Sequence, residues 1–254
     1  MKRLVALLVA SAIAAGGCGG GSGSWQTRIF PPSTASQMVR IESDRPDERR
    51  EALQFVAADS GARNLVSVVK VFCLVARTDK DPMVRAAAVR GLGVMQGDEV
   101  MPTLSRVAIN DQSPYVRMDA AASLGRQAQP EGMPALVQSL QGDSNSDVRM
   151  TAADSLAAYK SKSAAEALIG ALRDPSLAVA QKAWQSLRYM TGQNLPRDDQ
   201  AWGEYLQSAD NPFVGYARPP AMPKGQNQRP QFTRGPLDFI KGLFAKDVQE
   251  AELQ

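Results

Sequence analysis

Three columns of apolar residues recur along this 254-residue chain at a spacing of 32 residues, shortened to 31 at the last step. In each copy a valine, an alanine and a leucine stand at positions i, i+4 and i+8, which form one stripe along an α-helix. Such a stripe needs a neighbour that covers it, and stacked copies provide one. The spacing therefore predicts a stack of helical repeats. The columns are Val84, Val116, Val148 and Val179; Ala88, Ala120, Ala152 and Ala183; and Leu92, Leu124, Leu156 and Leu187.

A second apolar stripe lies between these copies, where Leu104, Leu136 and Leu168 are again 32 residues apart. Pro102 and Pro134 precede this stripe at the same spacing, in a first helical turn where a missing N–H costs little. Each repeat is therefore expected to be a pair of short helices, with alanine allowing close approach between neighbours.

The repeat extends towards the N-terminus in a divergent form. Arg49 aligns with Arg85 at a spacing of 36 residues, and Ala52 and Val56 follow it at helical intervals. We therefore predict a first helix over 46–58 and a second over 61–77. The stack, of four to five helix pairs, is predicted to span 41–209.

A valine–arginine pair opens three of the copies, and an aspartate lies in the turn before each pair. This pattern resembles HEAT repeats, in particular the short HEAT-like type of phycobilisome-lyase-like proteins. The tetratricopeptide and ankyrin signatures, which have nearby periods, are absent. The resemblance implies an all-α, right-handed α-solenoid of helix pairs.

In the HEAT family the aspartate and arginine columns form a ladder along the stack. The resemblance carries this role to Asp81, Asp111 and Asp143, which are also expected to cap helices, and to Arg85, Arg117 and Arg149. Ala180 replaces the arginine of the fourth copy, so the ladder is expected to end there. A row of ligand-binding arginines is the alternative interpretation.

Aromatic residues mark the end of the stack. Asp198 and Asp199 offer an N-cap for a short helix that carries Trp202 and Tyr205. Together with Trp184, this stretch resembles the closing segment of bacterial HEAT-repeat lipoproteins. We expect these aromatics to cover the last apolar face, as solenoids require; an aromatic ligand site is the alternative.

The N-terminus has the pattern of an export signal. Lys2 and Arg3 precede an apolar run over 4–15, too short to span a bilayer, and small residues lead to Cys18. This resembles a bacterial lipoprotein signal, although Ala15 stands where that family usually has leucine. The resemblance implies that residues 1–17 are removed and that Cys18 carries fatty acyl chains such as palmitate. An ordinary secretory signal, with Cys18 left as a free thiol, is the alternative.

The segments that flank the stack are expected to be disordered. Residues 18–40 begin with a Gly/Ser-rich run, typical of a flexible tether. Residues 210–236 contain six prolines and four basic residues, which favours an extended basic linker. Residues 237–254 place apolar side chains on one helical face. This short amphipathic helix is expected to dock on the solenoid, bind a partner or rest on a membrane surface.

Composition excludes most familiar catalytic sites. The chain has no histidine, which removes Ser-His-Asp triads and His-ligated metals, and its two cysteines cannot build a cysteine-rich metal site. Cys73 lies in an apolar helical stretch and is expected to be a core residue. No phosphate-binding glycine loop occurs. We therefore expect no enzymatic activity, no cofactor, no metal and no small-molecule substrate; a HEAT-like lyase is the least favoured alternative.

Charge does not favour nucleic acid as a partner. The net charge is only +3, and removal of Lys2 and Arg3 with the signal would lower it to about +1. We therefore predict a membrane-anchored scaffold that binds an unidentified protein of the cell envelope, on the periplasmic side of the outer membrane. The alternative is a structural component whose basic tail binds an anionic polymer such as peptidoglycan.

Overall fold

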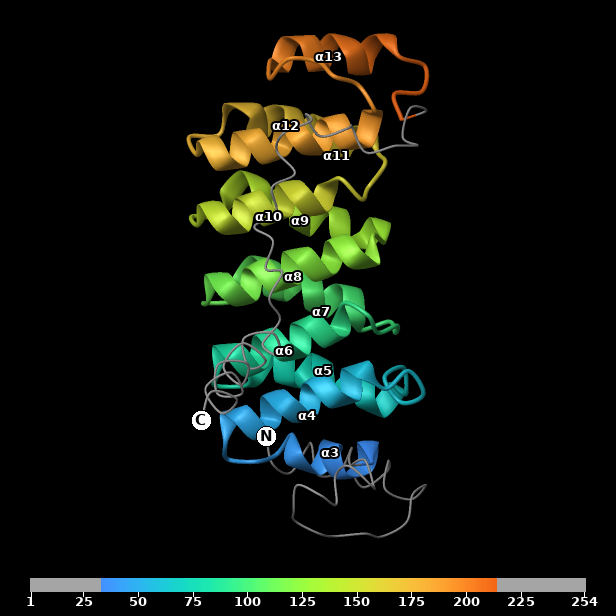
Figure 1. Ribbon diagram of the computed structural model, residues 1–254, viewed down its shortest axis with the longest axis vertical. Helices are drawn as coiled ribbons and strands as arrows, with labels where there is room; N and C mark the ends of the chain where they lie inside the picture. Colours follow the sequence, from blue (N-terminus) through green and yellow to red (C-terminus); the bar gives the residue numbers. More distant parts are fainter. Residues whose placement is uncertain (1–32, 214–254) are drawn as a thin grey trace, which may run out of the picture. The chain divides into compact units, whose positions relative to one another are not determined.

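The computed structural model describes residues 33–213, which form eleven α-helices and two short 3-10 helices and contain no strand (Figure 1). The α-helices are α3 (Thr34–Arg40), α4 (Pro46–Ala58), α5 (Val66–Thr78), α6 (Pro82–Leu92), α7 (Val100–Asn110), α8 (Pro114–Gln127), α9 (Met133–Gly142), α10 (Ser146–Leu156), α11 (Lys162–Gly170), α12 (Leu177–Thr191) and α13 (Asp199–Ser208). The 3-10 helices are η1 (Pro130–Gly132) and η2 (Ala171–Arg173).

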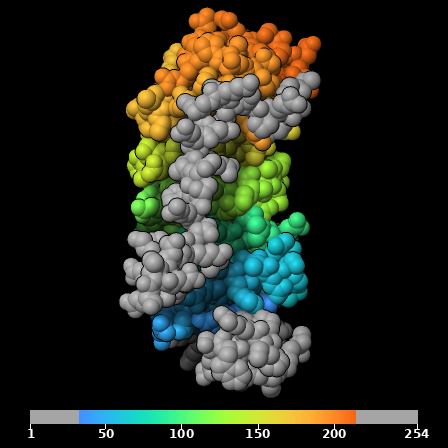
Figure 2. All heavy atoms as spheres, viewed as in Figure 1, coloured from blue at the N-terminus to red at the C-terminus, as the bar shows by residue number. Residues whose placement is uncertain are grey.

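The helices form two layers, each in chain order. In one layer α4, α6, α8, α10 and α12 pack successively against one another, and in the other α5, α7, α9, α11 and α13 do the same. The layers meet through the pairs α5–α6, α7–α8, α9–α10 and α11–α12. Figure 2 shows the consequence at the surface, where the colours of the described residues succeed one another in sequence order. The predicted all-α solenoid of helix pairs is confirmed.

The core consists of the repeated columns. Every member of the valine, alanine and leucine columns has zero solvent exposure, as have Leu104, Leu136 and Leu168 of the second stripe. The side chain of Cys73 is equally buried, and burial raises the pKa of its thiol above the usual value, which keeps it protonated. These residues are therefore explained by packing between neighbouring helices.

Most helices begin where the sequence provides a start signal. Proline occupies the first turn of α4, α6 and α8, and the side chain of Asn145 accepts hydrogen bonds from the backbone at the start of α10. The first predicted helix, 46–58, has the observed bounds of α4. The second begins at Val66 and not at 61, because Asp59 organises a turn whose carboxylate accepts the N–H of Gly61 at 3.0 Å.

The start of the stack differs from the prediction. The tether expected over 18–40 includes α3, in which Met38 is 1% exposed and packs into the core; Ile41 follows it at 4%. The side chain of Ser33 caps this helix by accepting the N–H of Ser36. A short segment with one deeply buried methionine therefore covers the first repeat, and the packed region begins near residue 34.

Several sequence predictions concern residues outside the described range. They are the signal over 1–17, the acylated Cys18, the tether up to residue 32, most of the linker over 210–236 and the amphipathic helix over 237–254. Within residues 33–213, none of the helices combines the length and the apolar character that crossing a membrane requires.

Close packing between the two layers predicts that Gly91 does not tolerate a larger side chain. A Cβ atom at this position would lie 2.4 Å from Cε1 of the buried Phe72 ring, so Gly91→Ala forces the ring or the helix to shift. We expect a loss of about 1–3 kcal/mol in the free energy of unfolding, measured by denaturant titration. Gly142→Ala is the matched control, because its Cβ would meet no atom within 4 Å. Equal stability of the two variants would contradict the packing at Gly91.

Candidate functional site

The turns that join the two helices of each pair are linked by ion pairs. Four arginines each donate from Nε and Nη2 to both oxygens of one aspartate in the following turn, at 2.6–2.9 Å. The pairs are Arg49–Asp79, Arg85–Asp111, Arg117–Asp143 and Arg149–Asp174. We call these eight residues the Asp–Arg ladder.

Each ladder residue also closes its own turn. Nη1 of Arg85 donates to the carbonyl of Asp79 at 2.9 Å, and Nη1 of Arg117 donates to the carbonyl of Asp111 at 2.8 Å. Oδ1 of each ladder aspartate accepts the N–H of the residue two positions later, for example Ser113 on Asp111 at 2.8 Å. One arginine thus fixes its own turn and attaches it to the next.

The structure brings together only some of the residues expected in the ladder. Arg85 pairs with Asp111 and Arg117 with Asp143, whereas Arg149 pairs with Asp174, which sequence reasoning missed. Asp81 does not belong to the ladder: its carboxylate caps α6, accepting the N–H groups of Met83 and Val84.

Asp79, and not Asp81, occupies the position that corresponds to Asp111 and Asp143, and it pairs with Arg49. The pairs Arg49–Asp79 and Arg149–Asp174 had a detectable signal, because the aspartates recur at the repeat spacing. Asp111 and Asp143 terminate the preceding helices and do not cap the following ones. Beyond Asp174, Ala180 is buried and the described ladder ends.

The charged groups of the ladder are paired with one another, so they present few free hydrogen-bonding groups to a ligand. Its side chains are only 6–15% exposed. The hydrogen bond to Asp111 raises the pKa of Arg85, and the hydrogen bond from Arg149 lowers the pKa of Asp174. Burial would raise the pKa of Asp143, but hydrogen bonds from Arg117 and the backbone of Asn145 outweigh it and lower the pKa. These shifts favour the charged forms of Arg85, Asp143 and Asp174, and the carboxylates and guanidinium groups of the ladder pairs are directed at one another.

The predicted cap aromatics gather at the end of the stack. Trp202 is fully buried, and its Nε1 donates to the carbonyl of Pro196 at 2.8 Å. Nε1 of Trp184 donates to Leu195 at 2.8 Å, and the Tyr205 hydroxyl donates to Pro212 at 2.9 Å. Because these polar groups are bonded to backbone carbonyls, the arrangement favours a structural cap over an aromatic ligand site.

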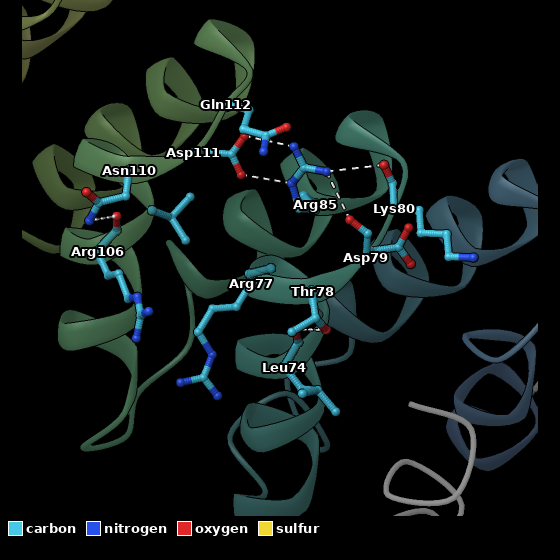
Figure 3. A pocket seen from close by; sticks show the side chains of 12 residues that line it. Leu74, Arg77, Thr78, Asp79, Lys80, Arg85, Arg106, Asn110, Asp111 and Gln112 are labelled. Atoms are coloured by element: carbon cyan, nitrogen blue, oxygen red, sulfur yellow. Dashed lines mark hydrogen bonds and ion pairs between the residues drawn. The ribbon is translucent and has the colours of Figure 1, made fainter.

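Two grooves flank the turn that contains Asp79. One has a volume of about 640 Å³ and lies between the C-terminal ends of α5 and α7 (Figure 3). The other, of about 470 Å³, lies between that turn and the turn before α4. Arg77, Lys80 and Arg106 line the first groove, which we call the α5–α7 groove. Among residues 33–213, no group of three or more cysteine, aspartate or glutamate side chains could hold a metal ion.

Comparisons with known proteins identify the repeat. A family model described as HEAT repeats matches residues 38–125, 69–157, 101–188 and 133–217. The search of curated proteins finds no match. Among solved structures, the X-ray structure of the Escherichia coli protein YibA is similar, with 18% sequence identity over 75% of this chain and 82% of that chain and a TM-score of 0.32.

The ladder makes stability depend on an ionised carboxylate. Asp143→Asn removes the negative charge that Arg117 contacts. We therefore expect the free energy of unfolding at neutral pH to fall by about 1–3 kcal/mol, measured by denaturant titration. Asp154→Asn is the control, because that side chain is 66% exposed in its pair with Lys182 and such pairs contribute about 0–1 kcal/mol.

The same pair predicts a pH dependence. The folded-state pKa of Asp143 is lowered, so its contribution is present above the unfolded value of about 3.9 and is lost as the pH falls through the folded value. The difference between wild type and Asp143→Asn should therefore shrink below about pH 4 in denaturation curves. A difference that persists unchanged well below about pH 4 would show that the charge of Asp143 does not contribute to the free energy of unfolding.

Proposed function

The chain belongs to the HEAT-repeat family, and we propose on that premise that it is a non-enzymatic scaffold whose solenoid binds another protein at a membrane of the bacterial cell envelope. A stack of helix pairs offers an extended surface, and each repeat contributes exposed side chains to it. The envelope location and the anchor rest on the N-terminal pattern, and the binding role rests on the fold.

One observation carries the binding role: the polar residues that recur with the repeat are already occupied. The ladder arginines donate hydrogen bonds from Nε, Nη1 and Nη2 to turns of the same stack. Arg117, for example, donates to the carboxylate of Asp143 and to the backbone carbonyl of Asp111. What differs between repeats is the set of exposed side chains. A surface that varies over a uniform framework suits recognition of a partner better than catalysis at one centre.

The membrane attachment proposed here depends on Cys18. Diacylation would hold the chain on a membrane far more firmly than one acyl chain, and the Gly/Ser-rich run after the cysteine would separate the solenoid from the bilayer. We favour the periplasmic face of the outer membrane, where the partner would be another envelope protein.

The anchor is tested by fractionation. Cys18→Ser should move the chain from the membrane fraction to the soluble fraction, because no acyl chain could be attached. Ser22→Ala, in the same Gly/Ser-rich run, should leave the distribution unchanged. Membrane association of the Cys18→Ser chain equal to wild type would refute the lipid anchor.

The competing role, polymer binding through the basic tail, makes a different prediction. Truncation after Phe213 keeps the packed residues, including the contact of Tyr205 with Pro212, and removes the rest of the tail. Crosslinking to a protein partner should survive truncation and high salt if the solenoid binds it. Sedimentation with peptidoglycan that vanishes under both conditions, without any protein crosslink, would instead establish the polymer role.

A further inference from the structure

The α5–α7 groove carries positive charge that no salt bridge among residues 33–213 neutralises, although Nε of Arg77 donates a hydrogen bond to the carbonyl of Cys73 at 3.0 Å. Arg77, Lys80 and Arg106 line it, and none of them forms an ion pair with another residue in the range 33–213. The two carboxylates in the lining, Asp79 and Asp111, are each held by a ladder arginine. The groove therefore has a local excess of cations.

The repeat itself shows that these cations are not required for folding. At the position of Arg77, the other repeats have Ile109, Gln141 and Leu172. The position of Arg106 is occupied elsewhere by Leu74, Gln138 and Ile169, and that of Lys80 by Gln112, Ser144 and Pro175. All three positively charged residues thus occur in this one groove, at positions where equivalent helix pairs carry uncharged residues.

The groove combines these charges with an apolar floor. Figure 3 shows Arg77 and Arg106 extending from α5 and α7 into the space between the two helices. Leu74, Ala76 and Val107 provide apolar lining. A guanidinium group pairs with a carboxylate through two parallel hydrogen bonds, which a lysine cannot reproduce.

We propose that the α5–α7 groove binds an acidic segment of the partner protein, with carboxylates on Arg77 and Arg106 and an aliphatic side chain on the floor. The inference deepens the proposed function and rests on it. A volume of about 640 Å³ admits several residues of a peptide. No aromatic side chain lines the groove, so the stacking platform typical of sites for single-stranded nucleic acid is missing.

The test uses the purified full chain and a fluorescent peptide of alternating glutamate and leucine. The double variant Arg77→Gln/Arg106→Gln should weaken binding about five- to tenfold in fluorescence anisotropy, because two partly exposed guanidinium–carboxylate pairs are lost. Lys70→Gln/Arg197→Gln is the matched control: it removes the same charge from exposed positions outside the groove. Binding to this control should equal binding to wild type.

Other results would overturn the proposal. Equal weakening in both double variants would mean non-specific attraction, and absence of peptide binding to the wild type would mean that the groove does not accept such a segment. Displacement of the peptide by inorganic phosphate, but not by sodium chloride of equal ionic strength, would identify a small-anion site. If the double variant fails to fold by circular dichroism, the single variants Arg77→Gln and Arg106→Gln decide the same question.

Failure of this inference is distinguishable from failure of the proposed function. Crosslinking in cells is repeated with the Arg77→Gln/Arg106→Gln chain. A partner that crosslinks equally to wild type and variant leaves the scaffold role intact and removes the groove from it. A wild-type chain without any protein partner contradicts the scaffold role itself.

Discussion

A pair of short helices cannot bury two apolar faces by itself, and this constraint governs the whole molecule. Helices of eleven to fourteen residues, such as α7 and α8, are marginal in isolation because nucleation is unfavourable. In the stack, Val116, Ala120 and Leu124 of α8 are fully buried, since α8 contacts α6 before it and α10 after it. Alanine in the central column lets these helices approach closely, and Gly91 shows how little room remains. Stability is therefore a property of neighbouring repeats and not of any single one.

The Asp–Arg ladder is the polar counterpart of this packing. Each turn would otherwise leave a carboxylate and backbone carbonyls partly buried without partners. An arginine that binds both its own turn and the next satisfies these groups and fixes the register of adjacent pairs. Because the charges that recur with the repeat are paired within the stack, charged residues that do not recur are better candidates for binding a partner. Arg77, Lys80 and Arg106 are the clearest case, and they line one groove.

A different segment covers each end of the stack, and only the C-terminal one could be predicted from the sequence. At the C-terminal end, the tryptophans and an aspartate N-cap predicted a closing helix, and Trp202 is fully buried in α13. At the other end, α3 has only seven residues and buries Met38 and Gln37. So short a segment carries no periodic pattern, and the Gly/Ser-rich run before it suggested a tether instead.

The amino-acid sequence was sufficient to predict the class of fold, the buried columns and the aromatic cap, because a strict period forces equivalent residues into equivalent contacts. It did not predict which helices pack as pairs: 46–58 and 61–77 were expected to form one unit, whereas α5 packs against α6. The resemblance to HEAT repeats also identified three of the four arginines that form ion pairs along the stack, namely Arg85, Arg117 and Arg149, but not Arg49. The tertiary structure corrected one predicted member of the ladder: Asp81 and Asp79 are two residues apart, yet Asp81 caps a helix and Asp79 binds Arg49. It also decided that Arg77 and Arg106, 29 residues apart in the chain, line one groove. Such meetings depend on the angle and spacing of neighbouring helices, which the repeat period does not specify.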